Sequence, residues 1–127
     1  MDILSIGYAK THGGGGGSGM TRTTLYSNDW ATTPAETITL TDSYKNYDAL
    51  EFTVLRTAGN DVCPLEHIIS CESIAHEFSG KSTGIVLPFH STDFIAYYAT
   101  NDTTLTKVSS GGMVLAVAKI VGVKYAG

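Results

Sequence analysis

The sequence predicts an all-β protein: an antiparallel β-sandwich or jelly-roll-like domain of about eight strands, preceded by a short N-terminal anchoring segment. Two observations support this prediction. Apolar and polar residues alternate over strand-length segments, and turn-forming residues separate those segments. A third agrees with them: only 16% of the 127 residues are charged, and the many threonines suit the exposed faces of strands. A chain of this length is expected to form one domain with a substantial core.

Alternation is clearest in the first half of the chain. The segment ETITLT (36–41) places Ile38 and Leu40 on one face and three threonines on the other. In YDALEFTVLRT (47–57), large apolar residues alternate with small or polar ones, so we expect one face of this strand to be buried. The face expected to be buried carries Leu50, Phe52 and Val54, and the opposite face carries Ala49, Glu51 and Thr53.

Five later segments are also predicted to be strands, namely 66–79, 83–90, 93–100, 103–110 and 112–124. The first of them is rich in β-forming residues, with Ile74, His76 and Phe78 in phase along one face. Pro88 lies inside its segment and therefore predicts an edge strand or a bulge. The last segment is apolar on both faces, so we expect residues 113–118 to have a second surface that packs against another subunit.

Turn-forming residues lie between these segments, at Asn28-Asp29, Asp42-Ser43, Gly59-Asn60-Asp61, Ser79-Gly80, Asn101-Asp102 and Gly111-Gly112. No helical periodicity intervenes, so short turns are expected to join antiparallel strands. The chain divides into an N-terminal anchor segment (1–11), a glycine-rich connector (12–20) and a β-sandwich knob domain (21–127).

The anchor segment is short and apolar, and the connector contains five consecutive glycines. Such a run lets backbones approach more closely than any Cβ would allow, so we expect it to pack against a docking protein or a second copy of the chain. A simple flexible hinge is the alternative. The residues expected to serve anchoring and assembly are Ile3, Leu4, Ile6, Tyr8, Gly13, Gly14, Gly15, Gly16 and Gly17.

The charge and hydropathy pattern argues against two classes of partner. The net charge is −4 and the eight basic residues are scattered, so we expect no nucleic-acid binding. No apolar run approaches the roughly 20 residues of a membrane span, and no basic region precedes an apolar signal core at the N-terminus. We therefore expect no membrane insertion, and synthesis in a cytoplasm.

Cysteine and histidine spacing gives only weak signals. Cys63 and Cys71 are too few for a disulfide scaffold, and free buried thiols are favoured over a bridge between them. The four histidines (12, 67, 76 and 90) contain no H-x-H or H-x₃-H pair. His67 and Cys71 would share one face of a strand, but an ordinary strand face explains that spacing better, so we expect no metal site.

Two segments resemble catalytic or nucleotide-binding motifs superficially. Residues 75–82 fit a loosened phosphate-binding loop, but strand-like residues flank the segment and a hairpin turn with a solvated Lys81 is the better interpretation. His90, Ser91 and Asp93 lie close together in sequence without a nucleophile elbow, so a polar loop is expected. We predict no catalytic residues, no cofactor and no enzymatic activity.

Aromatic residues offer a binding hypothesis. Tyr97 and Tyr98 are adjacent and must face opposite sides of their strand. Together with Trp30 and Tyr44, they could contact a surface ligand such as a sugar, as amphipathic rings often do. We favour a place in the core or in a subunit interface for most of these rings. A carbohydrate-binding β-sandwich module therefore stays as the alternative function.

Three stretches of the sequence resemble bacteriophage fibre and other virion appendage proteins. DILSIGYAK followed by the glycine run is similar to a short N-terminal segment of head-fibre and tail-fibre proteins. LY at 25–26 and ITLTDSYKNYD at 38–48 resemble the opening of their C-terminal β domains, and VAKIVGVK at 117–124 resembles their last strand. The matching positions in the opening are Leu25, Tyr26, Ile38, Thr39, Leu40, Ser43, Tyr44, Asn46, Tyr47 and Asp48.

The resemblance implies a homotrimeric β-sandwich knob on the surface of a virion. Its N-terminal segment would attach to a capsid, tail or baseplate protein, and the knob could contact a host surface glycan or protein. The chain lacks the long shaft of larger family members, which favours a compact head fibre, capsid decoration or tail-associated knob. The protein would be synthesised in the cytoplasm of the bacterial host. No catalytic residues come with the resemblance.

Overall fold

The computed structural model describes residues 19–28, 35–58, 61–78, 81–88, 94–111 and 115–126. The anchor segment and the five consecutive glycines, with every assembly residue predicted there, lie outside these ranges. Among the described residues, no helix is long and apolar enough to cross a membrane.

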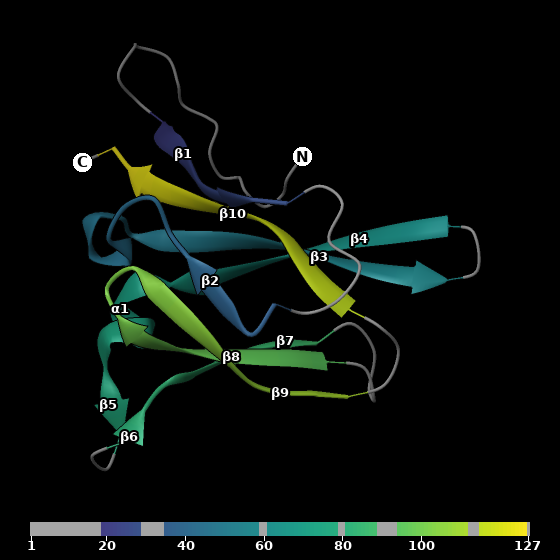
Figure 1. Cartoon of the computed structure of the whole chain (residues 1–127). Coiled ribbons are helices and arrows are strands. Elements are labelled where there is room, and N and C mark those ends of the chain that lie inside the picture. Colours follow the sequence, from purple (N-terminus) through teal and green to yellow (C-terminus); the bar gives the residue numbers. More distant parts are fainter. Residues whose placement is uncertain are drawn as a thin grey trace.

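Two four-stranded antiparallel sheets face each other (Figure 1), which confirms the predicted β-sandwich. Sheet A has the strand order β1-β10-β3-β4, and sheet B has the order β2-β9-β8-β7. The strands of sheet A are β1 (Met20–Ser27), β10 (Leu115–Tyr125), β3 (Ala49–Ala58) and β4 (Asp61–Ser70). The strands of sheet B are β2 (Thr37–Thr39), β9 (Thr104–Gly111), β8 (Phe94–Asn101) and β7 (Gly84–Pro88).

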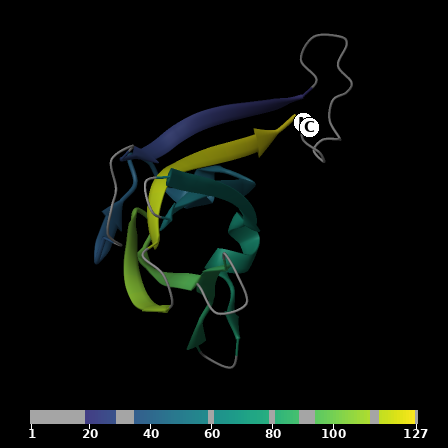
Figure 2. The ribbon, with the colours of Figure 1, turned by 90° about the vertical axis from the view of Figure 1, so that its right-hand side faces the viewer.

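The core lies between the sheets and follows the predicted alternation. Leu50, Phe52 and Val54 of β3 are fully buried. Sheet B contributes the facing side chains, of which Ile95 and Tyr97 of β8 are also fully buried. Figure 2 shows the two layers from the side, with β1 and β10 extending together beyond the rest of the sandwich.

The prediction of one continuous strand over 66–79 is wrong. The strand β4 ends at Ser70, and helix α1 (Cys71–Ala75) and the short hairpin strands β5 (Glu77–Phe78) and β6 (Lys81–Ser82) follow it. Strand β4 stops because Ser70 pairs with Ala49, the first residue of β3, so no strand remains beside position 71. Cys71 and Ile74 are both buried, and their spacing of three residues places them on one side of a helical turn.

The open edges of the two sheets are joined by a side chain. Strand β7 is the edge of sheet B, which confirms the position predicted for Pro88. His67 on β4, the edge of sheet A, places Nε2 2.7 Å from the carbonyl oxygen of Pro88. The ring N–H therefore donates to a carbonyl group on the facing sheet and links the edge strands of the two sheets.

Three consecutive residues of the final strand, which point to both faces of sheet A, are buried within one chain. Ala116, Val117 and Ala118 are each at most 5% exposed, so no second subunit is needed to cover them. The register of β10 on β3 shifts at Ala118, and the N–H of Asn28 donates to the carbonyl of Ala118 at 2.7 Å. The predicted subunit surface at 113–118 is therefore not supported at these three positions.

One glycine next to the run has a clear structural role. Gly19 precedes β1 with a φ of +95°, a backbone conformation that other residues rarely adopt. Its carbonyl oxygen accepts a hydrogen bond from the N–H of Ala126 at 3.0 Å, which ties the start of β1 to the end of β10.

Candidate functional site

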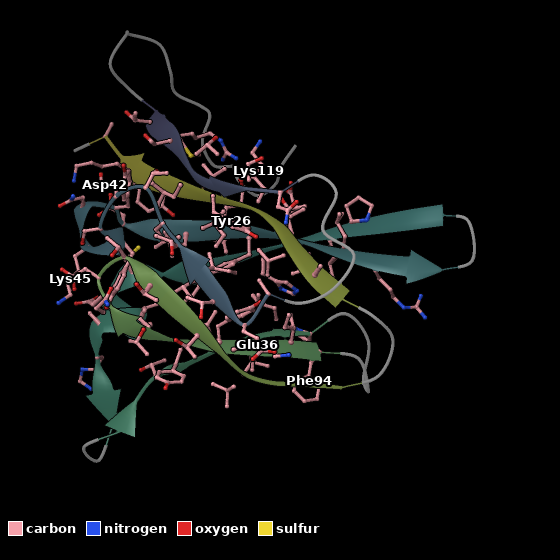
Figure 3. The ribbon with its side chains drawn as sticks, in the orientation of Figure 1. Tyr26, Glu36, Asp42, Lys45, Phe94 and Lys119 are labelled. Atoms are coloured by element: carbon pink, nitrogen blue, oxygen red, sulfur yellow. The ribbon has the colours of Figure 1, made fainter. Side chains whose placement is uncertain are left out.

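Residues 42–48 form a corner at one end of the sandwich, and five of them are among the positions on which the resemblance was suggested. This 42–48 corner, DSYKNYD in sequence, leads from β2 to β3 and contains a 3₁₀ helix at Tyr44–Asn46. Figure 3 shows Asp42 and Lys45 at this end. The corner is the part of the described chain in which sequence signal and dense polar contacts coincide.

Asp42 organises the corner through its carboxylate. One oxygen accepts hydrogen bonds from the N–H of Ser43 at 2.8 Å and from Nδ2 of Asn46 at 2.9 Å. The other accepts a hydrogen bond from the hydroxyl of Tyr47 at 2.9 Å. A short aspartate that bonds the following backbone N–H groups is a typical turn-forming residue.

Ser43 and Tyr44 fix the start of the 3₁₀ helix. The hydroxyl of Ser43 accepts a hydrogen bond from the N–H of Lys45 at 3.1 Å and so caps the helix. The side chain of Tyr44 is only 4% exposed, and its N–H donates to the carbonyl of Asp102 at 3.0 Å. This bond connects the corner to the turn between β8 and β9.

Tyr47 packs its ring directly on a glycine of the neighbouring strand. A Cβ added at Gly122 of β10 would lie 2.7 Å from Cγ and Cδ1 of Tyr47 and 2.9 Å from Cδ2. Only a glycine leaves room for the ring in this position. Steric space therefore explains why a glycine occupies position 122. The close contact also holds the ring of Tyr47 against the core.

Asp48 ties three elements together. Its N–H donates to the carbonyl of Val123 at 2.8 Å, and its carbonyl accepts from the N–H of Cys71 at 2.9 Å. Its side-chain oxygen Oδ2 accepts from the N–H of Tyr125 at 2.7 Å. The last residue of the 42–48 corner therefore anchors both the end of β10 and the start of α1.

The electrostatics of the corner follow from these bonds. Hydrogen bonds from Tyr47, from the N–H of Ser43 and from Asn46 lower the pKa of Asp42 below its ordinary value of 3.8, against a smaller opposing effect of desolvation. Desolvation and the bond to Asp42 raise the pKa of Tyr47. The ionised carboxylate and the neutral phenol are thus the forms that the folded protein stabilises.

We expect Asp42 to make stability depend on acid pH. Because its folded pKa lies below the unfolded value, the contribution is fully present above about pH 4 and is lost as the pH falls through the folded pKa. An Asp42→Asn variant should unfold at lower temperature than the wild type at neutral pH, and the two midpoints should converge in acid. Thermal unfolding from neutral to acid pH measures this, and Asp102→Asn, at an exposed ion pair with Lys45, is the control. A constant difference at all pH values would contradict it.

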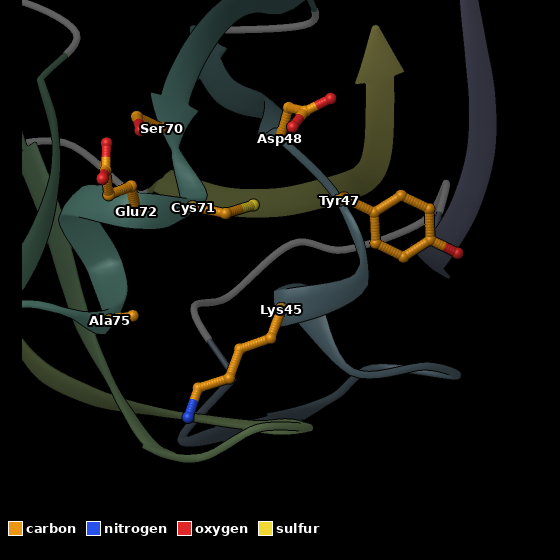
Figure 4. Close-up of a pocket in the computed structure, with 7 residues that line it drawn as sticks. All are labelled: Lys45, Tyr47, Asp48, Ser70, Cys71, Glu72 and Ala75. Carbon is orange, nitrogen blue, oxygen red and sulfur yellow. The ribbon is translucent and has the colours of Figure 1, made fainter. Parts of the chain in front are cut away.

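A pocket of about 440 Å³ opens beside the corner (Figure 4). It lies between the 3₁₀ helix and α1, and its lining residues are Lys45, Tyr47, Asp48, Ser70, Cys71, Glu72 and Ala75. Two of the charged groups of this pocket already have protein partners. Asp48 accepts from Tyr125, and the ammonium of Lys45 lies 3.3 Å from a carboxylate oxygen of Asp102.

Cys71 is the only nucleophilic thiol among the residues that line this pocket. Figure 4 shows its side chain directed toward the side of Tyr47 and Asp48. The thiol is free and buried, as the sequence favoured. Burial, and secondarily the charge of Asp48, raise its pKa to about 11, so the thiolate is scarce at neutral pH. The thiol of Cys71 is therefore not an activated nucleophile.

We expect Cys71 to resist alkylation in the folded protein. A pKa raised from 9.0 to about 11 reduces the thiolate fraction near neutral pH by about 100-fold, and burial limits access further. Maleimide labelling followed by peptide mass mapping should show slow reaction of Cys71 in buffer and rapid reaction in denaturant. Mapping by peptide separates Cys71 from Cys63. Equal labelling rates in the two conditions would show that the thiol is accessible.

The structure also bears on the other sites that the sequence suggested. Within residues 75–82, β5 (Glu77–Phe78) pairs with β6 (Lys81–Ser82), which confirms the hairpin interpretation over a phosphate-binding loop. His67 contacts Pro88, whereas Cys71 lies in α1, so the two do not share a strand face. No group of three or more metal-ligating side chains occurs in the described part of the chain. The predicted polar loop at 90–93 lies outside the described residues.

The aromatic residues proposed for ligand contact are partly buried. Tyr97 is fully buried and its hydroxyl donates to the carbonyl of Ala35 at 2.8 Å; burial raises its pKa. Tyr44 is also buried, so the expectation of a surface contact is wrong for both, because their rings fill the core. Tyr98 is half-buried, and Trp30 lies outside the described residues. The carbohydrate-binding alternative therefore loses two of its four rings.

The sequence analysis did not identify the contact of Gly122 with Tyr47 or the pocket beside α1. The run IVGVK contains a glycine inside a strand, a signal that another group approaches the backbone closely, but it does not say which group.

No family model matches the sequence, and no curated protein matches it either.

Proposed function

We propose that this chain is a structural component of a bacteriophage virion: a homotrimeric knob on the particle surface, of head-fibre, capsid-decoration or tail-fibre type. The observation that supports it most is the 42–48 corner. The residues of this corner that resemble phage fibre domains, among them Ser43, Tyr47 and Asp48, are those that cap the 3₁₀ helix, cover Gly122 and anchor β10. The resemblance therefore rests on residues that build the knob.

The chemistry of the described residues is consistent with a structural role. The 42–48 corner uses its carboxylates to hold backbone and side-chain donors, and the neighbouring pocket contains a protonated thiol and an ion-paired lysine. In this proposal the N-terminal segment attaches the knob to a capsid, tail or baseplate protein, and the sandwich faces outward, where it could meet a host surface.

Electron microscopy of virions from cells that produce the particle tests this function. An antibody against the 21–127 domain should label one set of surface projections, and the occupancy should come in multiples of three. Sedimentation of the purified chain should give the mass of a trimer of 13.5 kDa chains. A chain that is monomeric across micromolar concentrations and is absent from purified particles would refute the proposal.

A further inference from the structure

Apolar side chains gather on the outer face of sheet B, the face turned away from sheet A. Side chains that alternate with the core residues of β7, β8 and β9 point to this face. Val86 pairs with Ala96, and Ala96 lies opposite the bulge of β9 that contains Val108. Val86 and Val108 are 54% and 58% exposed. Phe94 and Tyr98, at the neighbouring outward positions of β8, complete what we call the sheet B patch.

By strand register, the described outward positions of sheet B carry no charged side chain. Lys107 of β9 pairs with Tyr97, whose side chain faces the core, and its ammonium lies 2.8 Å from a carboxylate oxygen of Glu36. Threonines of β2 and β9 border the patch, so the face is apolar in the middle and hydroxyl-bearing toward one side. The outer face of sheet A is different, because it carries the ion pair of Arg22 with Glu51, together with Lys119 and Glu66. Figure 3 shows Lys119 on β10 and Phe94 on the other sheet.

The distribution of charge indicates which partner fits the patch. The chain has a net charge of −4, so two copies repel each other over most of their surfaces. At the sheet B patch no charged side chain of the described outward positions opposes the second copy, and no charged group loses its hydration when two such faces meet. A charged partner would leave its own charges without counterparts there. The face that matches an uncharged patch with a threonine border is the same face of a second copy.

The size of the face limits the strength of the contact. Four strands about 4.8 Å apart, with about six residues each at about 3.3 Å, cover an area of about 19 by 20 Å. A standard interface buries about 800 Å² of accessible surface on each partner. A face of this size suits reversible association that depends on the concentration of the isolated protein.

We propose that the outer face of sheet B is the surface through which copies of this chain associate, with Val86 and Val108 at the centre of the contact. In the trimer the three faces surround the symmetry axis, and one side of each face meets the opposite side of the same face on a neighbouring copy, because contacts in a three-fold ring are heterologous. The inference rests on the proposed self-association and adds its location, which the sequence had assigned to residues 113–118.

Sedimentation velocity of the full chain across the micromolar range tests the location. The variant Val86→Glu/Val108→Glu adds two like charges to the centre of each face, and we expect it to sediment as a monomer at concentrations where the wild type associates. The matched control is Ile68→Glu, because Ile68 is 56% exposed on the outer face of sheet A. We expect this control to associate as the wild type does.

The outcomes separate the location from the function. Association of the double glutamate variant, equal loss of association in Ile68→Glu, or a monomeric wild type would overturn the location. A wild-type dimer that the double variant dissociates would support the location and contradict the homotrimer. If the double variant fails to fold by circular dichroism, Val86→Thr/Val108→Thr replaces it, since threonine keeps the shape and strand preference of valine. That variant should weaken association without lowering the thermal midpoint below that of Ile68→Thr.

Discussion

Substitution of Gly122 by alanine is expected to destabilise the fold by about 2–3 kcal/mol, at the upper part of the range for overpacking a close contact. The new methyl group would lie 2.7 Å from two ring carbons of Tyr47, one of which is Cγ at the base of the ring. Because Cγ cannot move without the whole side chain, the ring must leave its place and its hydrogen bond to Asp42. Chemical denaturation should show the loss, and the thermal midpoint should fall by roughly 8–12 °C.

Two further variants show whether the ring is the cause. Gly84→Ala is the control, because nothing lies within 4 Å of a Cβ at Gly84 and we expect little change. In a Tyr47→Ala background, Gly122→Ala should cost almost nothing, since the methyl group then meets no ring. Additive losses in the double variant would mean that Gly122 is needed for another reason.

Replacement of Gly13–Gly17 by five alanines is expected to abolish assembly while the 21–127 domain keeps its fold. The physical reason is that five methyl groups would hold apart backbones that glycine allows to approach closely. Particle incorporation and sedimentation measure assembly, and the thermal unfolding midpoint measures the fold. The expected result is a folded chain that is absent from particles.

A flanking variant makes the result specific. His12→Ala/Ser18→Ala changes the two residues that border the five glycines and leaves the run itself intact. We expect it to assemble normally. If the five-alanine variant also assembles, the run acts only as a hinge, and the site through which the chain docks must lie elsewhere.

The sequence predicted most strands to within a few residues, because one face of each is buried against the other sheet. The strict alternation at Leu50, Phe52 and Val54 follows from that burial, and all three residues are in the core. Pro88 predicted an edge strand or a bulge, since a residue without an N–H fits poorly inside a ladder, and the structure has the edge strand. These signals are local, so a single sequence carries them.

The errors arose where pairing between distant residues decides the structure. Residues 71–75 have a β-rich composition, yet they are helical because β3 begins at Ala49 and leaves them no partner. The same limit applies to the last strand, whose apolar residues suggested an intersubunit surface. Only the folded chain, in which Ala116 and Val117 pair with β3, shows that Ala116, Val117 and Ala118 are buried without a second subunit.

The sequence by itself determined the class of fold, and it limited the strand that contains Pro88 to an edge or a bulge. The tertiary structure alone decided what the 42–48 corner does. The contact of Tyr47 with Gly122 joins residues 75 positions apart, and the bond of Asp48 to Tyr125 joins residues 77 positions apart. Alternation reports whether a side chain is buried, whereas the identity of the residue across the contact depends on strand order and register, which local patterns do not encode.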